Sequence, residues 1–241
     1  MNILITGGSS GLGRCLVEKL AANNENIVYF TYNSKKKQAN EIASKYINVR
    51  CVRLDYCDME AVNAFVENEI PCMDLDILVN NAYVGLPNGT YFHKTELSDF
   101  LESFEQNLLP TIRITQGCIS GFRKKKSGRI INVLTSYLID LPPMGFSIYS
   151  ANKAYLSQLT KCWCKENSKF GITVNSVMPD YMQTSFAYVD ERVIEQMQQN
   201  HPLKELLKPE EVAEVIVSLI NASKQLNGVV IPITASQHIN Y

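Results

Sequence analysis

The sequence predicts an α/β fold: a doubly wound sheet of seven mainly parallel strands, flanked by helices on both faces. Short β-branched apolar runs alternate with longer helical patterns along all 241 residues. The apolar runs are continuous, which is typical of parallel strands that are buried on both faces. No linker-like stretch, change in composition or internal repeat interrupts the series, so residues 1–241 form one domain.

The individual elements follow in order along the chain. The strands are expected at residues 2–6, 26–32, 48–54, 75–80, 128–135, 171–177 and 228–233. The last helix shows the clearest helical spacing, with Val212, Val215, Ile216, Leu219 and Ile220 following Pro209. Residues from about 180 to 208 lie outside the alternation, and we interpret them as an insertion between the sixth strand and the last helix.

Composition and charge narrow the class of partner. The net charge is −1, so no overall positive field draws the chain to nucleic acid or to an anionic membrane. No segment is long and apolar enough to span a bilayer, and the start MNILIT lacks the basic flank of a signal peptide. We therefore expect a cytoplasmic protein with a small-molecule substrate. The seven scattered cysteines predict reduced thiols and no metal site.

Four glycines gather where the first strand ends and the first helix begins: Gly7, Gly8, Gly11 and Gly13. A glycine-rich turn lets backbone N–H groups and a helix N-terminus approach a pyrophosphate without obstruction by Cβ atoms. The turn therefore predicts a nucleotide site of the Rossmann type. The alternative is a tight turn that needs only a positive φ.

The spacing Thr6-Gly7-x-x-x-Gly11-x-Gly13 resembles that of the short-chain dehydrogenase/reductase family, and the resemblance continues along nearly the whole chain. The further matching positions, in family order, are Asp55, Asn80-Asn81-Ala82, Asn107, Ser136, Tyr149-x-x-x-Lys153, Pro179 and Thr184. In length and motif set the chain is most similar to the 3-oxoacyl-[acyl carrier protein] reductases.

Tyr149 and Lys153 lie four residues apart, so a helix places both on one face. An ammonium group beside a phenol favours the phenolate, which is expected to bring the pKa of Tyr149 closer to neutrality. The family resemblance implies that Tyr149 exchanges the substrate proton, Lys153 also holds the nicotinamide ribose, Ser136 positions the carbonyl and Asn107 anchors a water relay. The alternative is a helix face with a partly buried tyrosine and a solvated lysine.

The resemblance also implies a nicotinamide cofactor. The residues expected to bind it are Gly7, Ser9, Ser10, Gly11, Leu12, Gly13, Tyr32, Asn33, Ser34, Asp55, Asn81, Ala82, Tyr149, Lys153, Pro179 and Thr184. The second strand ends without the acidic residue that would repel a 2′-phosphate, which favours NADP(H) over NAD(H). The alternative is that Lys35, Lys36 and Lys37 only form the solvated start of a helix.

Two residues depart from the family pattern. Tyr83 and Asp180 stand where the family has glycine, and both add bulk near the expected nicotinamide. Asp180 also adds a negative charge, which is expected to alter cofactor affinity or redox preference.

Apolar residues predict a substrate lid and a pocket wall. They are Tyr181, Met182, Phe186, Tyr188, Val189, Ile194 and Met197 in the insertion, and Leu141, Pro142, Met144 and Phe146 before Tyr149. Such residues can equally form core.

A basic run, residues 123–126 together with Lys165 and Lys169, resembles a carrier-protein docking surface, although it can simply complement helix dipoles. The resemblance further implies a homodimer or homotetramer.

The sequence therefore predicts an NADPH-dependent oxidoreductase that reduces a carbonyl, as a 3-oxoacyl-[acyl carrier protein] reductase does in fatty acid biosynthesis. Two alternatives stay open. One is an NAD(P)-dependent alcohol dehydrogenase acting on a sugar or secondary-metabolite hydroxyl, and the other is a nucleotide-binding regulator without turnover.

Overall fold

A seven-stranded sheet forms the centre of the protein in a computed structural model, which describes residues 1–85, 89–182, 184 and 190–237. Its strand order is β3-β2-β1-β4-β5-β6-β7, and every pairing is parallel. The strands are β1 (Asn2–Ile5), β2 (Ile27–Tyr32), β3 (Val49–Arg53), β4 (Ile77–Asn80), β5 (Gly128–Val133), β6 (Ile172–Pro179) and β7 (Val230–Ile233). All seven predicted strands and the fold class are confirmed.

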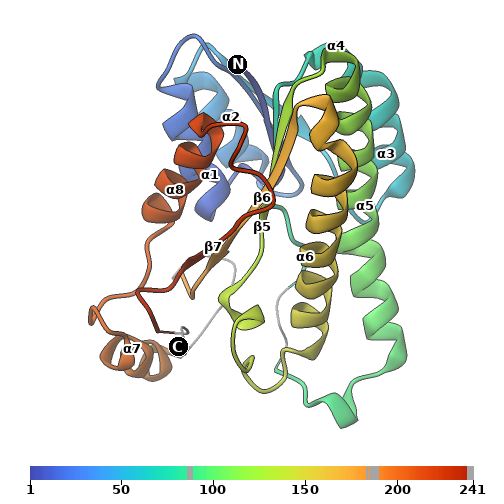
Figure 1. The fold of residues 1–241 in the computed structure, drawn as a ribbon. Helices are drawn as coiled ribbons and strands as arrows, with labels where there is room; N and C mark the ends of the chain where they lie inside the picture. Colours follow the sequence, from blue (N-terminus) through green and yellow to red (C-terminus); the bar gives the residue numbers. More distant parts are fainter. Residues whose placement is uncertain (86–88, 183, 185–189, 238–241) are drawn as a thin grey trace.

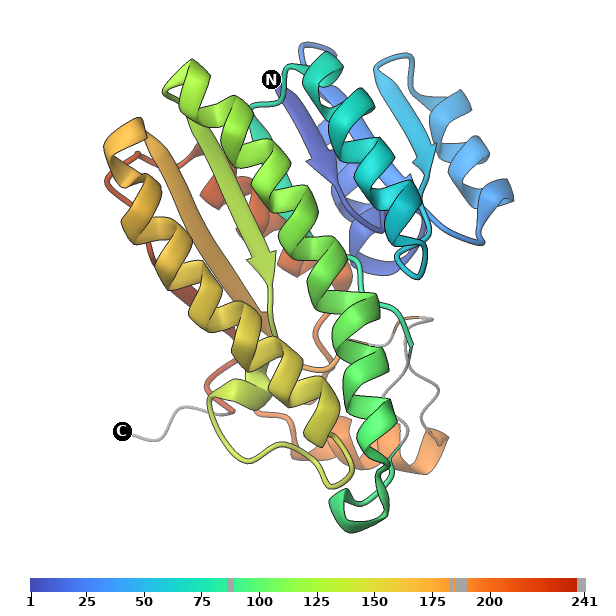
Figure 2. The ribbon, with the colours of Figure 1, turned by 90° about the vertical axis from the view of Figure 1, so that its right-hand side faces the viewer.

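Helices cover both faces of the sheet (Figure 1). One face carries α1 (Gly11–Ala21), α2 (Lys36–Lys45) and α8 (Pro209–Asn221). The other carries α3 (Met59–Ala64), α4 (Ile70–Met73), α5 (Leu97–Lys125) and α6 (Ser147–Asn167), of which α5 and α6 run side by side (Figure 2). The remaining elements are η1 (Phe65–Glu69), η2 (Phe92–Lys94), η3 (Ser136–Leu138), η4 (Ser168–Phe170) and α7 (Glu191–Asn200).

Successive residues of each central strand pack into opposite halves of the core. Ile3 and Ile5 of β1 join the cluster beneath α1 and α8, whereas Leu4 joins the cluster beneath α5 and α6. All three side chains are fully buried. Because a strand points alternate side chains to opposite faces, this double burial explains why the strands are apolar without alternation.

The strand order places a ligand crevice at one edge of the sheet. β1 lies between β2 and β4, so the chain turns to one side after β1 and to the other side later. In doubly wound sheets the crevice lies at such a switch point, outside the carboxyl ends of the strands. The glycine turn after β1 therefore faces the expected binding edge.

Most strand ends differ from the sequence prediction by one or two residues, and at two of them the structure shows why. β3 ends at Arg53, and Asp55 lies in a turn where its Oδ1 accepts a hydrogen bond from the N–H of Cys57 at 2.9 Å. β5 ends at Val133, and the Thr135 side chain then accepts a hydrogen bond from the N–H of Tyr137 at the start of η3. In both places a short polar side chain satisfies backbone donors that the sheet no longer uses.

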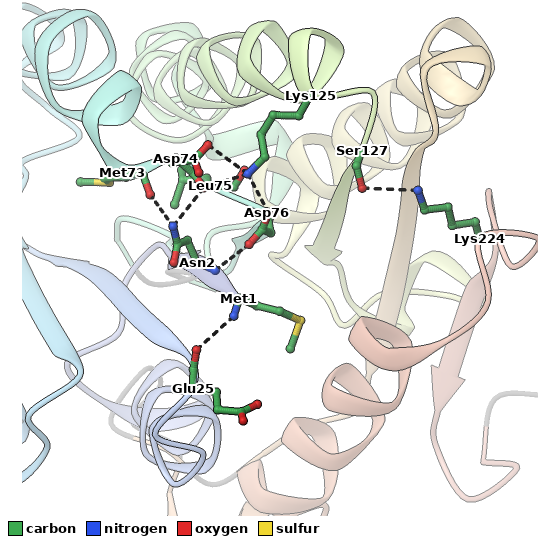
Figure 3. A network of polar contacts seen from close by, with 10 residues as sticks. All are labelled: Met1, Asn2, Glu25, Met73, Asp74, Leu75, Asp76, Lys125, Ser127 and Lys224. Atoms are coloured by element: carbon green, nitrogen blue, oxygen red, sulfur yellow. Dashed lines mark hydrogen bonds and ion pairs between the residues drawn. The ribbon is translucent and has the colours of Figure 1, made fainter.

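The basic run at the C-terminal end of α5 is partly engaged in contacts at the amino edge of the sheet. Lys125 Nζ lies 3.0 Å from Asp74 Oδ1 and 2.7 Å from Asp76 Oδ1, and Asn2 binds the other Asp76 oxygen (Figure 3). Arg123 donates to Asn167 Oδ1 of α6 at 2.7 Å, so the two helix ends are neighbours. This edge is opposite to the one that carries the crevice.

Among the described residues, no helix is both long enough and apolar enough to cross a bilayer. All seven cysteines are free thiols.

Candidate active site

A cavity of about 810 Å³ opens at the carboxyl edge of the sheet. Almost all of the residues predicted to bind a cofactor line it: Gly7, Ser9, Ser10, Gly11, Leu12, Gly13, Tyr32, Asn33, Ser34, Asn81, Ala82, Tyr149, Lys153, Pro179 and Thr184. The cavity thus joins the glycine turn, the end of β2 and the Tyr149–Lys153 pair in one space. Asp55, Asn107 and Ser136 are described residues that do not line it.

The glycine turn is shaped for close backbone approach. Gly7 and Gly11 have φ values of +70° and +51°, a region that other residues rarely adopt. A Cβ atom on Gly13 would lie 2.1 Å from the carbonyl oxygen of Gly7, so the strand and the helix meet there without space for a side chain. The glycines and their place after the first strand were sufficient to predict this turn.

Residues after β4 hold the turn in place. The Asn81 side chain donates to the carbonyl oxygens of Thr6 and Gly7 at 2.9 and 3.1 Å. The Thr6 hydroxyl accepts hydrogen bonds from the N–H groups of Asn81 and Ala82, both at 3.0 Å. Thr31 Oγ1, which sequence analysis missed, accepts from the Gly7 N–H at 3.1 Å.

The N-terminus of α1 suits an anionic group. Its N-cap residue, Ser10, makes no side-chain capping bond, and the first turn holds no acidic residue. The first N–H groups of a helix lack intrahelical partners and carry partial positive charge. These donors face the cavity beside Ser9 and Gly11, so the residues present fit the pyrophosphate of a dinucleotide.

Lys153 is almost completely buried beneath the catalytic end of the cavity. Its Nζ donates to the carbonyl oxygen of Val133 at 2.8 Å and lies 5.1 Å and 5.8 Å from the ring centroids of Tyr83 and Tyr149. Burial lowers the pKa of Lys153 to about 8. The solvated lysine of the alternative interpretation is therefore wrong.

Tyr149 is a neutral phenol in this arrangement. Burial raises the pKa of its hydroxyl, and a hydrogen bond with the Thr135 side chain offsets only part of that rise. The expected lowering of the Tyr149 pKa by Lys153 does not occur: burial of the phenol has the largest effect and raises the pKa, and burial also disfavours the charged form of Lys153. Thr135 lines the cavity, and sequence analysis did not identify it.

Aromatic rings enclose Tyr149. The ring centroids of Tyr83, Phe146 and Tyr137 lie 5.0, 6.2 and 6.4 Å from that of Tyr149, all in edge contact. These rings come from the segment after β4, from η3 and from the residues before α6. Their packing supplies the burial that raises the pKa of Tyr149.

Among the residues of the predicted apolar wall that the structure describes, some line the cavity and some do not. Phe146, Tyr181, Met182 and Met197 line it, together with Pro143 and Val193. Leu141 and Met144 are 87% and 75% exposed, and Pro142 is also exposed, while Ile194 is not a lining residue. Phe186, Tyr188 and Val189 lie outside the described residues.

Ser136 and Asp180 form a direct contact. The Ser136 hydroxyl is completely buried and donates to Asp180 Oδ1 at 3.2 Å, while Asp180 itself lines the cavity. The structure thus brings Ser136 beside the site but places the Asp180 carboxylate against its hydroxyl. Asn107 is buried in α5, where its side chain binds the backbone of Val84.

Comparison with known proteins agrees with this geometry. A family model described as short chain dehydrogenase matches residues 1–192. The chain belongs to the short-chain dehydrogenase/reductase family. Membership explains why the glycine turn, the Tyr149–Lys153 pair and Ser136 converge on one edge of the sheet, and it identifies the protein as an oxidoreductase.

Two curated relatives and one solved structure illustrate the similarity to other family members. A 3-oxoacyl-[acyl-carrier-protein] reductase of Aquifex aeolicus is 32% identical over 90% of this chain and 88% of its own. An acetoacetyl-CoA reductase of Rhizobium meliloti is 33% identical over 90% of this chain and 89% of its own. A structure of an ElxO variant with NADPH bound has a TM-score of 0.85 and 27% identity, covering 98% of both chains.

Proposed function

We propose that the protein is an NADPH-dependent reductase that converts the ketone of a 3-oxoacyl thioester into a secondary alcohol. The observation that carries this proposal is a neutral Tyr149 phenol held beside buried Lys153, in one cavity with the glycine turn. The relatives named as 3-oxoacyl-[acyl-carrier-protein] and acetoacetyl-CoA reductases support this substrate class. Such a reaction belongs to fatty acid synthesis and related acyl metabolism.

The residues present define how the cofactor is held. The uncapped start of α1 and the Gly7–Gly13 turn bind the pyrophosphate. Tyr32, Asn33, Ser34 and Lys35 line the cavity after β2 with no acidic group among them, which favours a 2′-phosphate and hence NADP(H) over NAD(H). The NADPH in the similar ElxO structure supports the same choice. NADPH supplies a hydride when it is bound.

Tyr149 acts as the general acid. Its raised pKa keeps the proton on the phenol at neutral pH, and this is the form that can protonate the substrate oxygen. Lys153 is held in place by its hydrogen bond to Val133 and by its contacts with the rings of Tyr83 and Tyr149. A positive charge at this position stabilises the negative charge that develops on the substrate oxygen. We expect Asn107 to hold the proton relay in position rather than to carry the proton itself.

We expect the segment from about 180 to 208 to act as a substrate lid. Tyr181, Met182, Val193 and Met197 of this segment all line the cavity, and they give it the apolar wall that an acyl chain requires. We expect a homodimer or homotetramer assembled through α5 and α6, on which Leu101 and Tyr155 are exposed.

The test follows the absorbance of NADPH with a panel of 3-oxoacyl thioesters on coenzyme A and on carrier protein. The native protein should oxidise NADPH, and Tyr149→Phe should lower kcat by about 10² to 10⁴ while NADPH still binds. Tyr155→Phe is the matched control, because Tyr155 lies on the same helix, outside the cavity. Cofactor binding without turnover on any carbonyl panel would contradict the proposal and support a regulator.

A second candidate, an alcohol dehydrogenase, is favoured by one observation. The Asp180 carboxylate accepts a hydrogen bond from the Ser136 hydroxyl and can also accept one from a substrate hydroxyl. If the protein is an alcohol dehydrogenase, assays with NADP⁺ and sugar or secondary alcohols should show oxidation of the alcohol at rates above those of thioester reduction.

A further inference from the structure

Asp180 is held rigidly at the end of β6. Its N–H donates to the carbonyl oxygen of Ile233 at 3.1 Å, next to the sheet edge. Its Oδ1 accepts from the N–H of Tyr181 at 2.8 Å, which fixes the direction of the side chain toward η3. The same oxygen accepts from Ser136 Oγ at 3.2 Å. The position of the carboxylate is therefore set by the backbone on one side and by the serine on the other.

The carboxylate stands between Ser136 and the cavity. Ser136 has no exposed surface, whereas Asp180 is partly exposed and lines the cavity. The field of Asp180 also reaches the cavity wall: after burial, it is the next cause that raises the pKa of Tyr137 to about 12. A ligand at this end of the cavity therefore meets a negative charge before it meets the serine hydroxyl.

We propose that Asp180 tunes this site toward the oxidised cofactor and keeps the Ser136 proton from the substrate oxygen. The inference rests on the proposed function, because it assumes that a nicotinamide occupies the Tyr149 end of the cavity. The nicotinamide ring is cationic when oxidised and neutral when reduced, so a fixed carboxylate nearby attracts only the oxidised form.

Simple chemistry limits how far the ring can lie from this charge. Hydride transfer requires contact of about 3–3.5 Å between the ring and the carbonyl carbon. The carbonyl oxygen takes its proton from Tyr149, and the Tyr137 ring, on which the Asp180 charge acts, has its centroid 6.4 Å from that of Tyr149. Asp180 and Tyr149 line the same cavity, so a nicotinamide held at the Tyr149 end lies near enough to the carboxylate for its charge to act on the ring.

The reaction itself balances without Asp180. When bound, NADPH would supply a hydride with its two electrons to the carbonyl carbon. Tyr149 would give its proton to the oxygen, and the phenol would regain a proton from solvent. Ketone, NADPH and a proton thus give alcohol and NADP⁺. Since an enzyme cannot change this overall equilibrium, Asp180 acts through the relative affinity of the two cofactor forms and through the equilibrium on the enzyme.

The first experiment measures the dissociation constants of NADP⁺ and NADPH by calorimetry for the native protein, Asp180→Asn and Asp180→Gly. Asn keeps an oxygen that can accept from Ser136 and Tyr181 but removes the charge. Both variants should weaken NADP⁺ binding relative to NADPH by about tenfold. Asp140→Asn is the control, because Asp140 is exposed and does not line the cavity, and it should leave the affinity ratio unchanged.

The second experiment tests the serine. If Asp180 holds the Ser136 hydroxyl away from the substrate, then Ser136→Ala should lower kcat only slightly in the native protein. In Asp180→Gly the hydroxyl is free to bind the substrate oxygen, so Ser136→Ala should lower kcat more there. The two costs in kcat for ketone reduction should differ by tenfold or more in this double-mutant cycle. Unequal losses of kcat support the inference. Equal losses overturn the claim that Asp180 keeps the Ser136 proton from the substrate oxygen.

The outcomes separate the two proposals. An unchanged NADP⁺ to NADPH affinity ratio in both Asp180 variants, with both cofactors still bound, overturns this inference and leaves the proposed function intact. Failure of the native protein to bind either cofactor overturns the proposed function itself.

Discussion

The side chain of Asn107 forms a closed pair of hydrogen bonds with the backbone of Val84. Its Oδ1 accepts from the Val84 N–H at 2.6 Å, and its Nδ2 donates to the Val84 carbonyl oxygen at 3.2 Å. The pair ties α5 to the segment that follows β4, which carries Asn81 and Tyr83 to the cavity. Asn107 is therefore a positioning residue in this structure, and its part in a water relay stays a prediction.

Replacement of Asn107 by alanine should disturb stability and cofactor binding together. The variant leaves the Val84 backbone groups without their partner, so the free energy of unfolding should fall by about 1–3 kcal/mol. NADPH affinity should fall several-fold, because the segment after β4, which lines the cavity, loses its attachment to α5 at Val84. Urea unfolding and NADPH titration measure the two effects. Gln116→Ala, an exposed position on α5, is the control, and equal losses in both variants would contradict this role.

Lys153 should make the stability of the cofactor-free protein depend on pH. Burial lowers its pKa to about 8, from the usual 10.5. Below pH 8 the folded state must bury a charge, whereas between 8 and 10.5 only the unfolded state keeps the proton, so stability rises with pH in that window. Tyr149 has the opposite effect, because its raised pKa removes stability above pH 10, where the unfolded phenol ionises.

The measurement compares urea unfolding of the native protein and Lys153→Met at pH 7 and pH 9.5, below the range in which tyrosine contributes. The native protein should gain about 2 kcal/mol more than the variant over this interval, which corresponds to 1.36 kcal/mol for each pH unit above 8. A parallel pH dependence of the two proteins would show that Lys153 is solvated.

Gly13→Ala should damage the glycine turn, whereas Gly121→Ala should be harmless. A Cβ atom on Gly13 meets the Gly7 carbonyl oxygen at 2.1 Å and Asn81 Nδ2 at 2.7 Å, while one on Gly121 meets nothing within 4 Å. We expect a loss of about 1–3 kcal/mol and at least tenfold weaker NADPH binding for the first variant. The second should gain up to about 1 kcal/mol from helix propensity. Wild-type NADPH affinity in Gly13→Ala would refute the expected strand-to-helix contact.

The basic run should not control the use of a carrier-bound substrate. Lys125 is paired with Asp74 and Asp76, and the run ends α5 about 27 Å along the helix axis from Asn107, for 18 residues at 1.5 Å each. Lys124→Glu should therefore change kcat/KM for a carrier-bound thioester by less than twofold. The coenzyme A thioester serves as the matched substrate. A selective loss with the carrier-bound substrate would restore the docking interpretation.

Local patterns were sufficient to predict the fold and the glycine turn. The central strands β1 and β4 show their burial in continuous apolar runs, and the spacing of Gly7, Gly11 and Gly13 indicates the tight turn that requires them. The spacing of Tyr149 and Lys153 likewise fixed their common helix face. These features depend on residues close together in the chain.

The features that the sequence could not predict depend on contacts between distant segments. The pKa of Tyr149 rises because Tyr83, Tyr137 and Phe146 enclose it, and no pattern within α6 indicates that burial. The bond between Ser136 and Asp180 joins residues 44 positions apart, and only the register of β5 and β6 brings them together. Thr135 could have been found, since it precedes Ser136 at the cavity edge of the sheet.

The place of β1 in the middle of the sheet affects how the protein is made. β1 pairs with β2 and with β4, and the glycine turn that follows it is secured by Asn81. During synthesis the first strand must therefore wait until residues 77–81 leave the ribosome before its second edge is covered. Until then the nascent chain exposes an apolar strand edge, and its glycine turn is not yet secured for binding a pyrophosphate. The cofactor therefore cannot assist folding before about a third of the sequence has emerged.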